Sequence, residues 1–336
     1  MPEPLSRGAL GLLVFLAGPL LSPGCARAPG AAMDPGAARA LVEAKAPAVR
    51  EKDRFSFLAL GDMGTGGKGQ LELRDGMARV LAEKPVDFGL LLGDLFYQDG
   101  LEAPSDPAFD RLFKNVYTEA AFPFPFFPVL GNHDYHGNAA AVLTLGRRDS
   151  RWRMPARRYV VKVPLAGTEA VFVALDTTPL DNPSRVTPDL DVRPPLEGVA
   201  DALAAARGAA WRFAFGHHLL RSSGVHAKSE PMLREAAPVL AAGWVDVYFC
   251  GHDHIIEALD PIAGVAQIIS GGGGGSDRPY PIRNVLPESR FRKGGAGFVR
   301  CDVDVTQLTC TFHGEDGSLL YTHVVKAREK ALSGGA

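Results

Sequence analysis

Five short segments of the sequence place a glycine directly before residues that commonly bind metal ions. Glycine and aspartate favour turns in any protein, so a single pair of this kind carries little information. Five of them, each following a short apolar run, predict one shared site with mixed oxygen and nitrogen ligands, which suits iron, manganese or zinc. The segments are Gly61-Asp62, Gly93-Asp94, Gly131-Asn132-His133, Gly216-His217 and Gly251-His252-Asp253-His254.

The number of candidate ligands indicates two ions rather than one. Two aspartates, one asparagine and three histidines exceed what one four-coordinate ion requires, which favours two ions that share a ligand. These residues also have ordinary structural interpretations: Asp62 and Asp94 could be turn formers, and His217 could be a buried histidine with hydrogen-bond partners. Tyr97, three residues after Asp94, could likewise be a core aromatic. Those interpretations would have to hold together at every strand end, so we favour the metal centre.

The elements that position these residues follow from the pattern of apolar runs. Between residues 55 and 130, short apolar runs alternate with amphipathic stretches, which predicts a parallel α/β unit. Open α/β sheets bind ligands at the carboxyl ends of their parallel strands, which is where the candidate ligands stand. The expected strands are 55–60, 88–92 and 126–130, and the expected helices are 70–84 and 109–121.

The second half of the chain repeats this alternation less regularly. We expect a four-layer α/β/β/α sandwich of two mixed sheets flanked by helices. Gly271 to Gly275 directly follow an expected strand, so we interpret them as a loop that another segment approaches closely rather than as a linker. The expected helices are 196–207 and 230–241. The expected strands are 158–163, 170–175, 211–215 and 245–250, with shorter ones around 255 and at 265–269, 297–305, 308–313 and 319–325.

The N-terminus has the pattern of a targeting signal. Residues 9–21 are apolar apart from glycine and proline, and they are too few to span a bilayer, which needs ~20. The sequence Ser22-Pro23-Gly24-Cys25 resembles a bacterial lipobox, with Cys25 as the lipidated residue. The alternative is an ordinary secretory signal that is cleaved after Ala28 or Ala32.

These segments define the expected organisation and location of the protein. We expect a monomer that is exported and lipid-anchored to a bacterial cell envelope, or else periplasmic or secreted. A lipid on Cys25 would be its only membrane contact. The expected domains are a signal peptide at 1–24, an Ala/Pro/Gly-rich tether at 25–50, in which a short helix is possible near 37–44, and a metal-binding domain at 51–330.

Composition and cysteine placement narrow the function classes. The chain has 336 residues, of which 46% are hydrophobic, and its net charge is -2. This balance excludes global disorder and nucleic-acid binding driven by positive charge. Cys301 and Cys310 face each other in a predicted hairpin, where a disulfide and two reduced core thiols are both open. We expect Cys250 to pack below the metal-binding loop that it precedes.

The ordered motifs resemble those of a known family. Asp62-x-Gly64, Gly93-Asp-Leu-Phe-Tyr97, Gly131-Asn-His-Asp134, Gly216-His217 and Gly251-His-Asp-His254 are similar to the motifs of the calcineurin-like metallophosphoesterases. Tyr97 narrows the resemblance to the purple acid phosphatases, and in particular to the small, animal-type, tartrate-resistant form. The resemblance covers about residues 55–325 and implies the two-sheet sandwich expected above.

The resemblance implies a ligand set and a reaction. It places Fe(III) on Asp62, Tyr97 and His254, a divalent iron, zinc or manganese ion on Asn132, His217 and His252, and Asp94 between the two ions. It implies an acid phosphatase that hydrolyses phosphate monoesters by attack of a metal-bound hydroxide on phosphorus. His133 and His226 are the implied proton donors to the leaving alcohol, and Asp134 either orients His133 or caps the following helix.

Two other functions stay open on the sequence. One is a phosphodiesterase or nucleotidase of the same superfamily with a different metal pair, although such enzymes commonly lack a tyrosine at the position of Tyr97. The other is a surface lipoprotein that binds metal or phosphate without turnover. The chain also departs from the family after His217, where His218-Leu219-Leu220 replaces Tyr-Pro-Val. We expect His218 to pack rather than to contact substrate.

Overall fold

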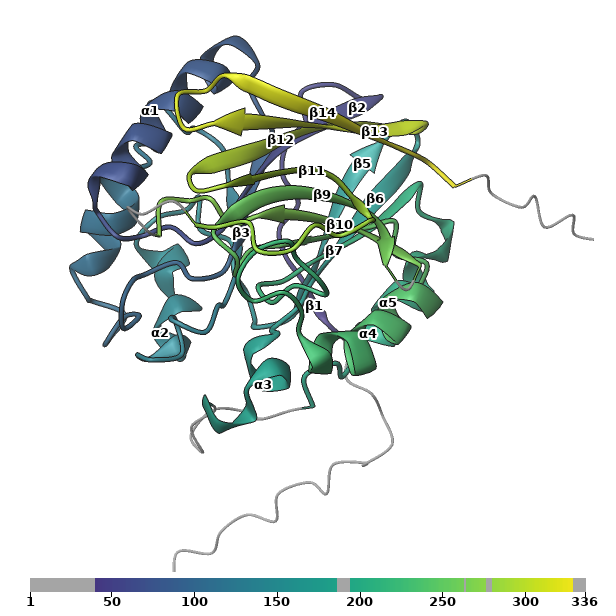
Figure 1. Cartoon of the computed structure of the whole chain (residues 1–336), viewed down its shortest axis with the longest axis horizontal. Coiled ribbons are helices and arrows are strands. Elements are labelled where there is room, and N and C mark those ends of the chain that lie inside the picture. The colour runs from purple at the N-terminus through teal and green to yellow at the C-terminus, as the bar shows by residue number, and fades with distance from the viewer. Residues whose placement is uncertain (1–39, 186–193, 263, 276–279, 329–336) are drawn as a thin grey trace, which may run out of the picture. The chain divides into compact units, whose positions relative to one another are not determined.

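The computed structural model describes residues 40–185, 194–262, 264–275 and 280–328 (Figure 1). The expected signal peptide, the Cys25 lipidation site and the expected tether up to residue 39 lie outside the described residues. No helix in the described ranges is both long enough and apolar enough to cross a membrane.

A six-stranded sheet carries the first three candidate ligand segments. Its strand order is β14-β13-β12-β2-β3-β4, and β2, β3 and β4 run parallel to one another. Helix α1 (Lys68–Glu83) connects β2 to β3 and buries Leu73 and Met77 against the core. The strands are β2 (Arg54–Leu60), β3 (Phe88–Leu92), β4 (Phe126–Val129), β12 (Gly297–Asp304), β13 (Gln307–Gly314) and β14 (Leu319–Lys326).

An eight-stranded sheet carries the other two segments. Its order is β1-β5-β6-β7-β8-β10-β9-β11, and β6, β7, β8 and β10 are parallel neighbours. Val42 and Glu43 lie within the segment expected as a tether or a short helix, but they form β1 and pair with β5. The strands are β1 (Val42–Glu43), β5 (Tyr159–Leu165), β6 (Thr168–Ala174), β7 (Trp211–Phe215), β8 (Val247–Cys250), β9 (Ile255–Ile262), β10 (Val265–Ser270) and β11 (Ser289–Gly294).

One expected helix is much shorter than the sequence predicts, whereas the helices expected at 70–84 and 230–241 are present. The expected helix 109–121 contains one π-helical turn, Asp110–Lys114, followed by turns. The Arg151 guanidinium donates to the carbonyls of Tyr117 and Phe122 at 2.7 and 2.9 Å, which satisfies these groups outside a helix. The other helical elements are α2 (Ala139–Val142), α3 (Thr178–Asp181), α4 (Val199–Ala205) and α5 (Ala237–Ala242), a second π-helical turn at Met232–Ala236, and short 3₁₀ turns at Leu145–Arg147, Pro183–Arg185 and Ala206–Gly208.

An aromatic core holds the two sheets face to face. Phe57 of β2 stacks on Phe88 of β3 at a centroid distance of 5.4 Å, and both rings are fully buried. Phe57 meets Phe172 of β6 and Phe249 of β8 edge-on at 5.4 and 5.3 Å. A second core lies between the eight-stranded sheet and helices α4 and α5, where Leu203 is among the buried side chains. The predicted α/β sandwich of two mixed sheets with flanking helices is therefore confirmed.

The described cysteines comprise one disulfide pair and one free thiol. Cys301 and Cys310 are direct partners across β12 and β13, with Cα atoms 4.2 Å apart, and they form a disulfide. Of the two states that the sequence leaves open, the structure has the oxidised one. Cys250 is a free, buried thiol at the end of β8, directly before the loop at residues 251–254, as expected.

Candidate metal centre

All five glycine segments lie where strands end. Asp62, Asp94 and Asn132 follow β2, β3 and β4 of the six-stranded sheet, whereas His217 and the loop at 251–254 follow β7 and β8 of the eight-stranded sheet. Parallel strands present their carboxyl ends at one edge, so each sheet gathers its own ligand segments. The two edges meet, which brings all seven predicted ligands together.

Four of these side chains surround one point. The Tyr97 hydroxyl lies 3.0 Å from Asp94 Oδ2, 3.4 Å from Asp62 Oδ1 and 3.1 Å from His254 Nε2. His254 Nε2 is also 3.6 Å from Asp62 Oδ1. The group contains two carboxylates, one phenol and one imidazole, which is a donor set rich in anionic oxygen.

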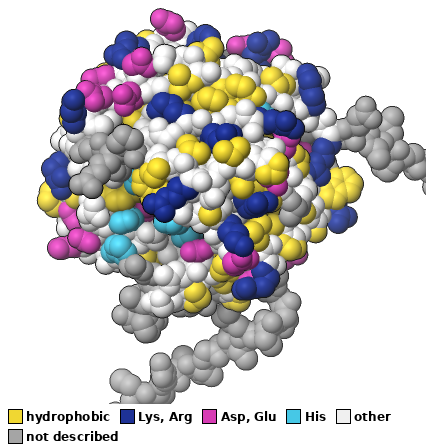
Figure 2. All heavy atoms as spheres, viewed as in Figure 1, with side chains coloured by type: hydrophobic (Ala, Val, Ile, Leu, Met, Phe, Trp, Pro, Cys, Tyr) yellow, Lys and Arg dark blue, Asp and Glu magenta, His cyan; other side chains and the backbone are white. Residues whose placement is uncertain are grey.

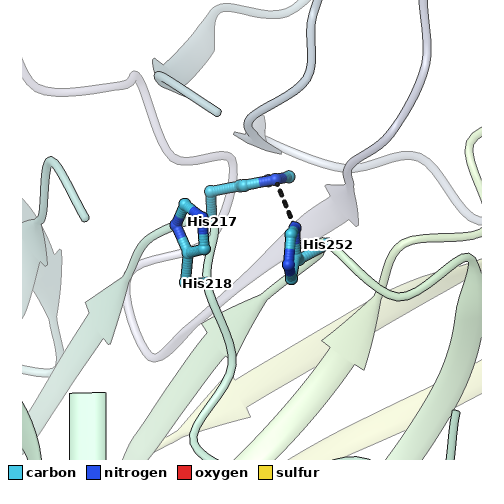
Figure 3. A group of neighbouring side chains, drawn as sticks. All are labelled: His217, His218 and His252. Carbon is cyan, nitrogen blue, oxygen red and sulfur yellow. Dashed lines mark hydrogen bonds between the residues drawn. The ribbon is translucent and has the colours of Figure 1, made fainter. Parts of the chain in front are cut away.

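A second group adjoins the first through Asp94. His217 Nε2 lies 3.1 Å from Asn132 Oδ1, 3.1 Å from His252 Nδ1 and 3.4 Å from Asp94 Oδ1. Figure 3 shows His217 and His252 facing each other, with His218 beside them. Asp94 therefore lies between the two groups, with one oxygen facing each of them.

The donor set fits metal ions better than it fits a hydrogen-bond network. In the first group a single hydroxyl proton on Tyr97 faces two carboxylate acceptors, Asp62 and Asp94, and a His254 nitrogen whose role depends on the tautomer. Zinc–oxygen and zinc–nitrogen bonds of ~2.0–2.2 Å place neighbouring donors of one ion about 3 Å apart. The observed spacings are of this size, so we conclude that these residues suit a cation at each group.

Backbone geometry aims the ligands at the centre. Asp62, Asp94 and His252 all adopt the left-handed region, with φ of 58°, 49° and 72°. The loops also hold one another, because Asp62 Oδ2 accepts from the His252 amide and Asp94 Oδ1 accepts from the His133 amide, both at 2.9 Å. Such conformations persist where the surroundings enforce them, and here each is enforced by a loop of another strand.

Gly93 permits a close approach between the two sheets at this site. A Cβ atom at Gly93 would lie 2.6 Å from His217 Nδ1, and the glycine has φ of +85°. His217 Nδ1 donates to the Leu92 carbonyl at 2.9 Å, which leaves Nε2 free to bind a metal. The eight-stranded sheet thus places its buried histidine directly on the backbone of the six-stranded one.

The protein's own groups leave the centre electrostatically strained. Burial raises the pKa of Tyr97, and Asp62 and Asp94 raise it further, so the phenol holds its proton unless a cation is near. Burial also raises the pKa of Asp62. Although burial alone would lower it, Asp94 and Asp62 raise the pKa of His217 to about 10. Without a metal ion, a proton on His217 therefore balances the negative charge of the carboxylates, and it occupies the position where a metal would bind.

His133 lies beside the first group, but Asp134 does not orient it. The His133 ring packs against Tyr97 at 4.5 Å and its Nδ1 donates to the Gln98 carbonyl at 2.7 Å. Asp134 instead accepts from the amides of Gly131 and Leu95, and burial raises its pKa to about 8. The first residue of α2 is Ala139 and its cap is Asn138, so both predicted roles of Asp134 are wrong. It joins the loops that follow β3 and β4.

His226 lies over the second group. Its ring stacks on His252 at a centroid distance of 4.0 Å, and its backbone amide donates to Asp253 Oδ1 at 3.2 Å. Asp253 is fully buried and holds this loop through the Val225 amide as well. The sequence signal for this role is the position of Asp253 between the candidate ligands His252 and His254.

His218 packs as expected. The Thr177 hydroxyl accepts from the amides of His217 and His218 and donates to His218 Nδ1 at 2.9 Å, so His218 carries its proton on Nε2. That nitrogen faces Asp181 at 3.5 Å. The His217, His218 and His252 rings are close enough to hold an ion together, but both nitrogens of His218 already have partners.

The centre opens to the surface on one side. Figure 2 shows histidine side chains gathered on one part of the face in view, with lysine or arginine and acidic side chains close by. The His133 and His254 side chains are 25% and 15% exposed, whereas those of Asp62 and His217 are fully buried. The glycine loop at 271–275 borders the centre, since a Cβ at Gly275 would lie 2.8 Å from the Tyr97 ring. The predicted close approach is confirmed.

The sequence profile and the curated relatives that match this chain point to the same family. A sequence profile of the calcineurin-like phosphoesterases matches residues 55–255. Purple acid phosphatase 3 of Arabidopsis thaliana is 32% identical over 82% of this chain and 79% of the relative. Human tartrate-resistant acid phosphatase type 5 is 27% identical over 84% of this chain and 92% of the relative.

Two solved structures share the fold. The structure titled "GAP50 the anchor in the inner membrane complex of Plasmodium" has a TM-score of 0.73 at 24% identity and covers 83% of this chain and 91% of that one. Purple acid phosphatase PPD1 from yellow lupin (Lupinus luteus) seeds has a TM-score of 0.61 at 19% identity over 84% of this chain and 55% of that one. With the profile match and the curated relatives, the chain belongs to the calcineurin-like phosphoesterases and, within them, to the purple acid phosphatases.

Proposed function

We propose that the protein is a metal-dependent acid phosphatase that hydrolyses phosphate monoesters at a two-metal centre. The observation that carries this proposal is the meeting of seven donors at 3.0–3.6 Å, arranged as two groups that share Asp94. Membership of the purple acid phosphatases supports the same reaction. A phosphodiesterase on this fold is the less favoured alternative because Tyr97 stands in the donor set.

The two groups suit different ions. Asp62, Tyr97 and His254 would hold Fe(III), because a hard, highly charged ion favours carboxylate and phenolate oxygen. Asn132, His217 and His252 would hold a divalent iron, zinc or manganese ion. When bound, the pair of ions supplies the positive charge that neutralises phosphate oxygens and lowers the pKa of water in the site.

The chain's own groups handle the proton that the leaving alcohol needs. His133, which is partly exposed, and His226, which is exposed, flank the two ligand groups. The Gln98 carbonyl accepts a hydrogen bond from His133 Nδ1, which leaves the Nε2 of His133 directed toward the centre, 4.0 Å from Asp94 Oδ2. Asp134 acts by keeping the loops after β3 and β4 in place.

Hydrolysis of p-nitrophenyl phosphate by the natively purified protein tests the reaction. We expect turnover that is highest at acidic pH and that is abolished in a His254→Ala variant. His323→Ala, on strand β14 away from the centre, is the matched control and should retain full activity. Failure of the wild-type protein to hydrolyse phosphate monoesters, while it hydrolyses bis(p-nitrophenyl) phosphate, would favour the phosphodiesterase.

Metal analysis and a visible spectrum test the identity of the ions. A phenolate bound to Fe(III) absorbs visible light by charge transfer, so we expect a coloured protein with one to two irons per chain. The Tyr97→Phe variant should lose the band while it keeps the fold. A colourless wild-type protein that carries only zinc or manganese would contradict the iron assignment.

We also propose that the chain is exported and carries a lipid on Cys25. The apolar segment at 9–21 and the sequence Ser22-Pro23-Gly24-Cys25 support this. The intact mass of protein extracted from membranes should correspond to a chain that begins at a diacylated Cys25, and Cys25→Ser should abolish the lipid. A soluble product that begins after Ala28 or Ala32 would indicate an ordinary secretory signal instead.

A further inference from the structure

Tyr280 contacts a ligand of the first group and a histidine that lies over the second group, although no motif points to it. It lies just after the glycine loop, outside any strand, and it is half-buried. Its ring stacks on His254 at a centroid distance of 4.5 Å and an interplanar angle of 25°. Its hydroxyl lies 3.4 Å from His226 Nε2. Tyr280 therefore joins a ligand of the first group to a proton-donor candidate over the second.

The other contacts of His226 do not fix the rotation of its ring, whereas the contact with Tyr280 does. One face of the imidazole is covered by His252 at 4.0 Å, and the backbone is held by Asp253. Stacking restrains the tilt of the ring but not its rotation within its own plane. The hydrogen bond from Nε2 to the Tyr280 hydroxyl is the contact that fixes this rotation.

We propose that Tyr280 is a positioning residue for His226 and that, through it, the enzyme acts on esters with poor leaving groups. This rests on the proposed phosphatase function. In the imidazolium form, Nε2–H donates to the Tyr280 oxygen, so Nδ1–H is the proton that remains to be given. As the P–O bond breaks, its electron pair stays on the leaving oxygen, and that oxygen takes the Nδ1 proton. His226 is then neutral and keeps its hydrogen bond to Tyr280.

The choice of substrate separates this role from simple packing. A p-nitrophenolate leaves without a proton, whereas an alkoxide needs one, so the loss of a proton donor affects alkyl phosphates far more than aryl phosphates. General acid catalysis contributes typically ~10²–10⁴-fold. A variant that only misplaces the donor should lose part of that factor.

Tyr280→Phe is the decisive variant because it keeps the ring stack on His254 and removes only the hydroxyl. We expect kcat for glycerol phosphate to fall about tenfold or more, with kcat for p-nitrophenyl phosphate changed less than about twofold and KM nearly unchanged. The visible spectrum and metal content should match the wild type, since the hydroxyl is not a metal ligand. Tyr321→Phe, on β14, is the matched control and should leave kcat unchanged for both substrates.

A double variant tests whether Tyr280 acts through His226. In a His226→Asn background, Tyr280→Phe should cause no further loss with glycerol phosphate. Equal losses for both substrates, or an additive effect in that background, would overturn the proposal. If the wild-type protein hydrolyses neither substrate, the proposed function itself has failed, and this result is distinguishable because it precedes any comparison of variants.

Discussion

The two sheets contribute different chemistry to the same centre. Loops after the six-stranded sheet supply all the oxygen donors, from Asp62, Asp94, Tyr97 and Asn132, whereas loops after the eight-stranded sheet supply all the nitrogen donors, from His217, His252 and His254. Each group of donors draws on both sheets. Neither sheet alone could bind either ion with the full set.

This division makes the packing between the sheets part of the site. The distances between oxygen and nitrogen donors depend on how the two sheets are held, and Phe57 is at the middle of that contact. Donor distances within one sheet depend instead on the local loops. Changes to the bridging carboxylate, to the packing between the sheets, to the contact of Gly93 with His217 and to the charge on His217 should have progressively smaller effects.

Asp94→Ala should have the largest effect, because Asp94 is the donor that faces both groups. We expect the loss of both ions and a fall in kcat of at least about 10³-fold, measured by metal analysis and by phosphate release. Asn132→Ala should lose only the ion of the second group. Asp99→Ala is the control, since its side chain is 91% exposed on the same loop. An Asp94→Ala protein that keeps two ions would contradict the bridging role.

Phe57→Ala should weaken the contact between the sheets without touching a donor. A large-to-small substitution of a buried phenylalanine costs about 3–5 kcal/mol of unfolding free energy. We expect metal affinity to fall at both groups as well, measured on protein that is still folded. Val324→Ala, which is 44% exposed on β14, should change stability by less than about 0.5 kcal/mol. Unchanged metal affinity in Phe57→Ala would show that the loops alone set the donor distances.

Gly93→Ala tests the close approach of Gly93 to His217, which joins the two sheets. The added Cβ would meet His217 Nδ1 at 2.6 Å in a backbone with φ of +85°. Gly167 has a similar φ of +78° with nothing within 4 Å, so Gly167→Ala carries the conformational cost alone, about 1 kcal/mol. We expect Gly93→Ala to cost about 2–3 kcal/mol in denaturant unfolding and to lower metal affinity. Equal costs in the two variants would exclude the steric contact.

The charge on His217 gives the smallest effect, visible after treatment with a chelator. Its folded-state pKa of about 10 exceeds the ordinary 6.5, so its proton stabilises the metal-free protein fully below pH 6.5, and this stability is lost as the pH rises toward 10. Melting temperatures should therefore fall over that range for the metal-free protein and change less for the metal-loaded one. Metal affinity should rise with pH over the same range, and His217→Gln should remove both trends.

The sequence predicted the centre better than its surroundings. The donors were visible because glycine, a polar ligand and a preceding apolar run recur in the same order, and local rules relate each run to a strand end. Asp134 was misassigned because its partners, the amides of Gly131 and Leu95, have no side-chain signature. Gln98 acts through its carbonyl, so its residue type carries no signal either.

Long-range packing accounts for the remaining differences. Strand β11 was missed because its residues, Ser289–Gly294, alternate weakly and are only partly buried. The helix expected at 109–121 ends early because the Arg151 guanidinium donates hydrogen bonds to the carbonyls of Tyr117 and Phe122. This contact joins segments that are far apart in the sequence. Tyr280 reaches the centre from a loop that no periodicity describes.

The pairing of β2 with β12 has a consequence for how the protein is made. Ser56 of β2 bonds to Asp302 of β12 across 246 positions of sequence, so the strand that carries Asp62 stays an open edge until the ribosome has made nearly the whole chain. The β2–β4 segment emerges early with its oxygen ligands but must wait for both the histidine loops and its own neighbouring strand. A complete metal site therefore needs segments from both halves of the chain, so metal binding to the full donor set must follow the synthesis of the histidine loops.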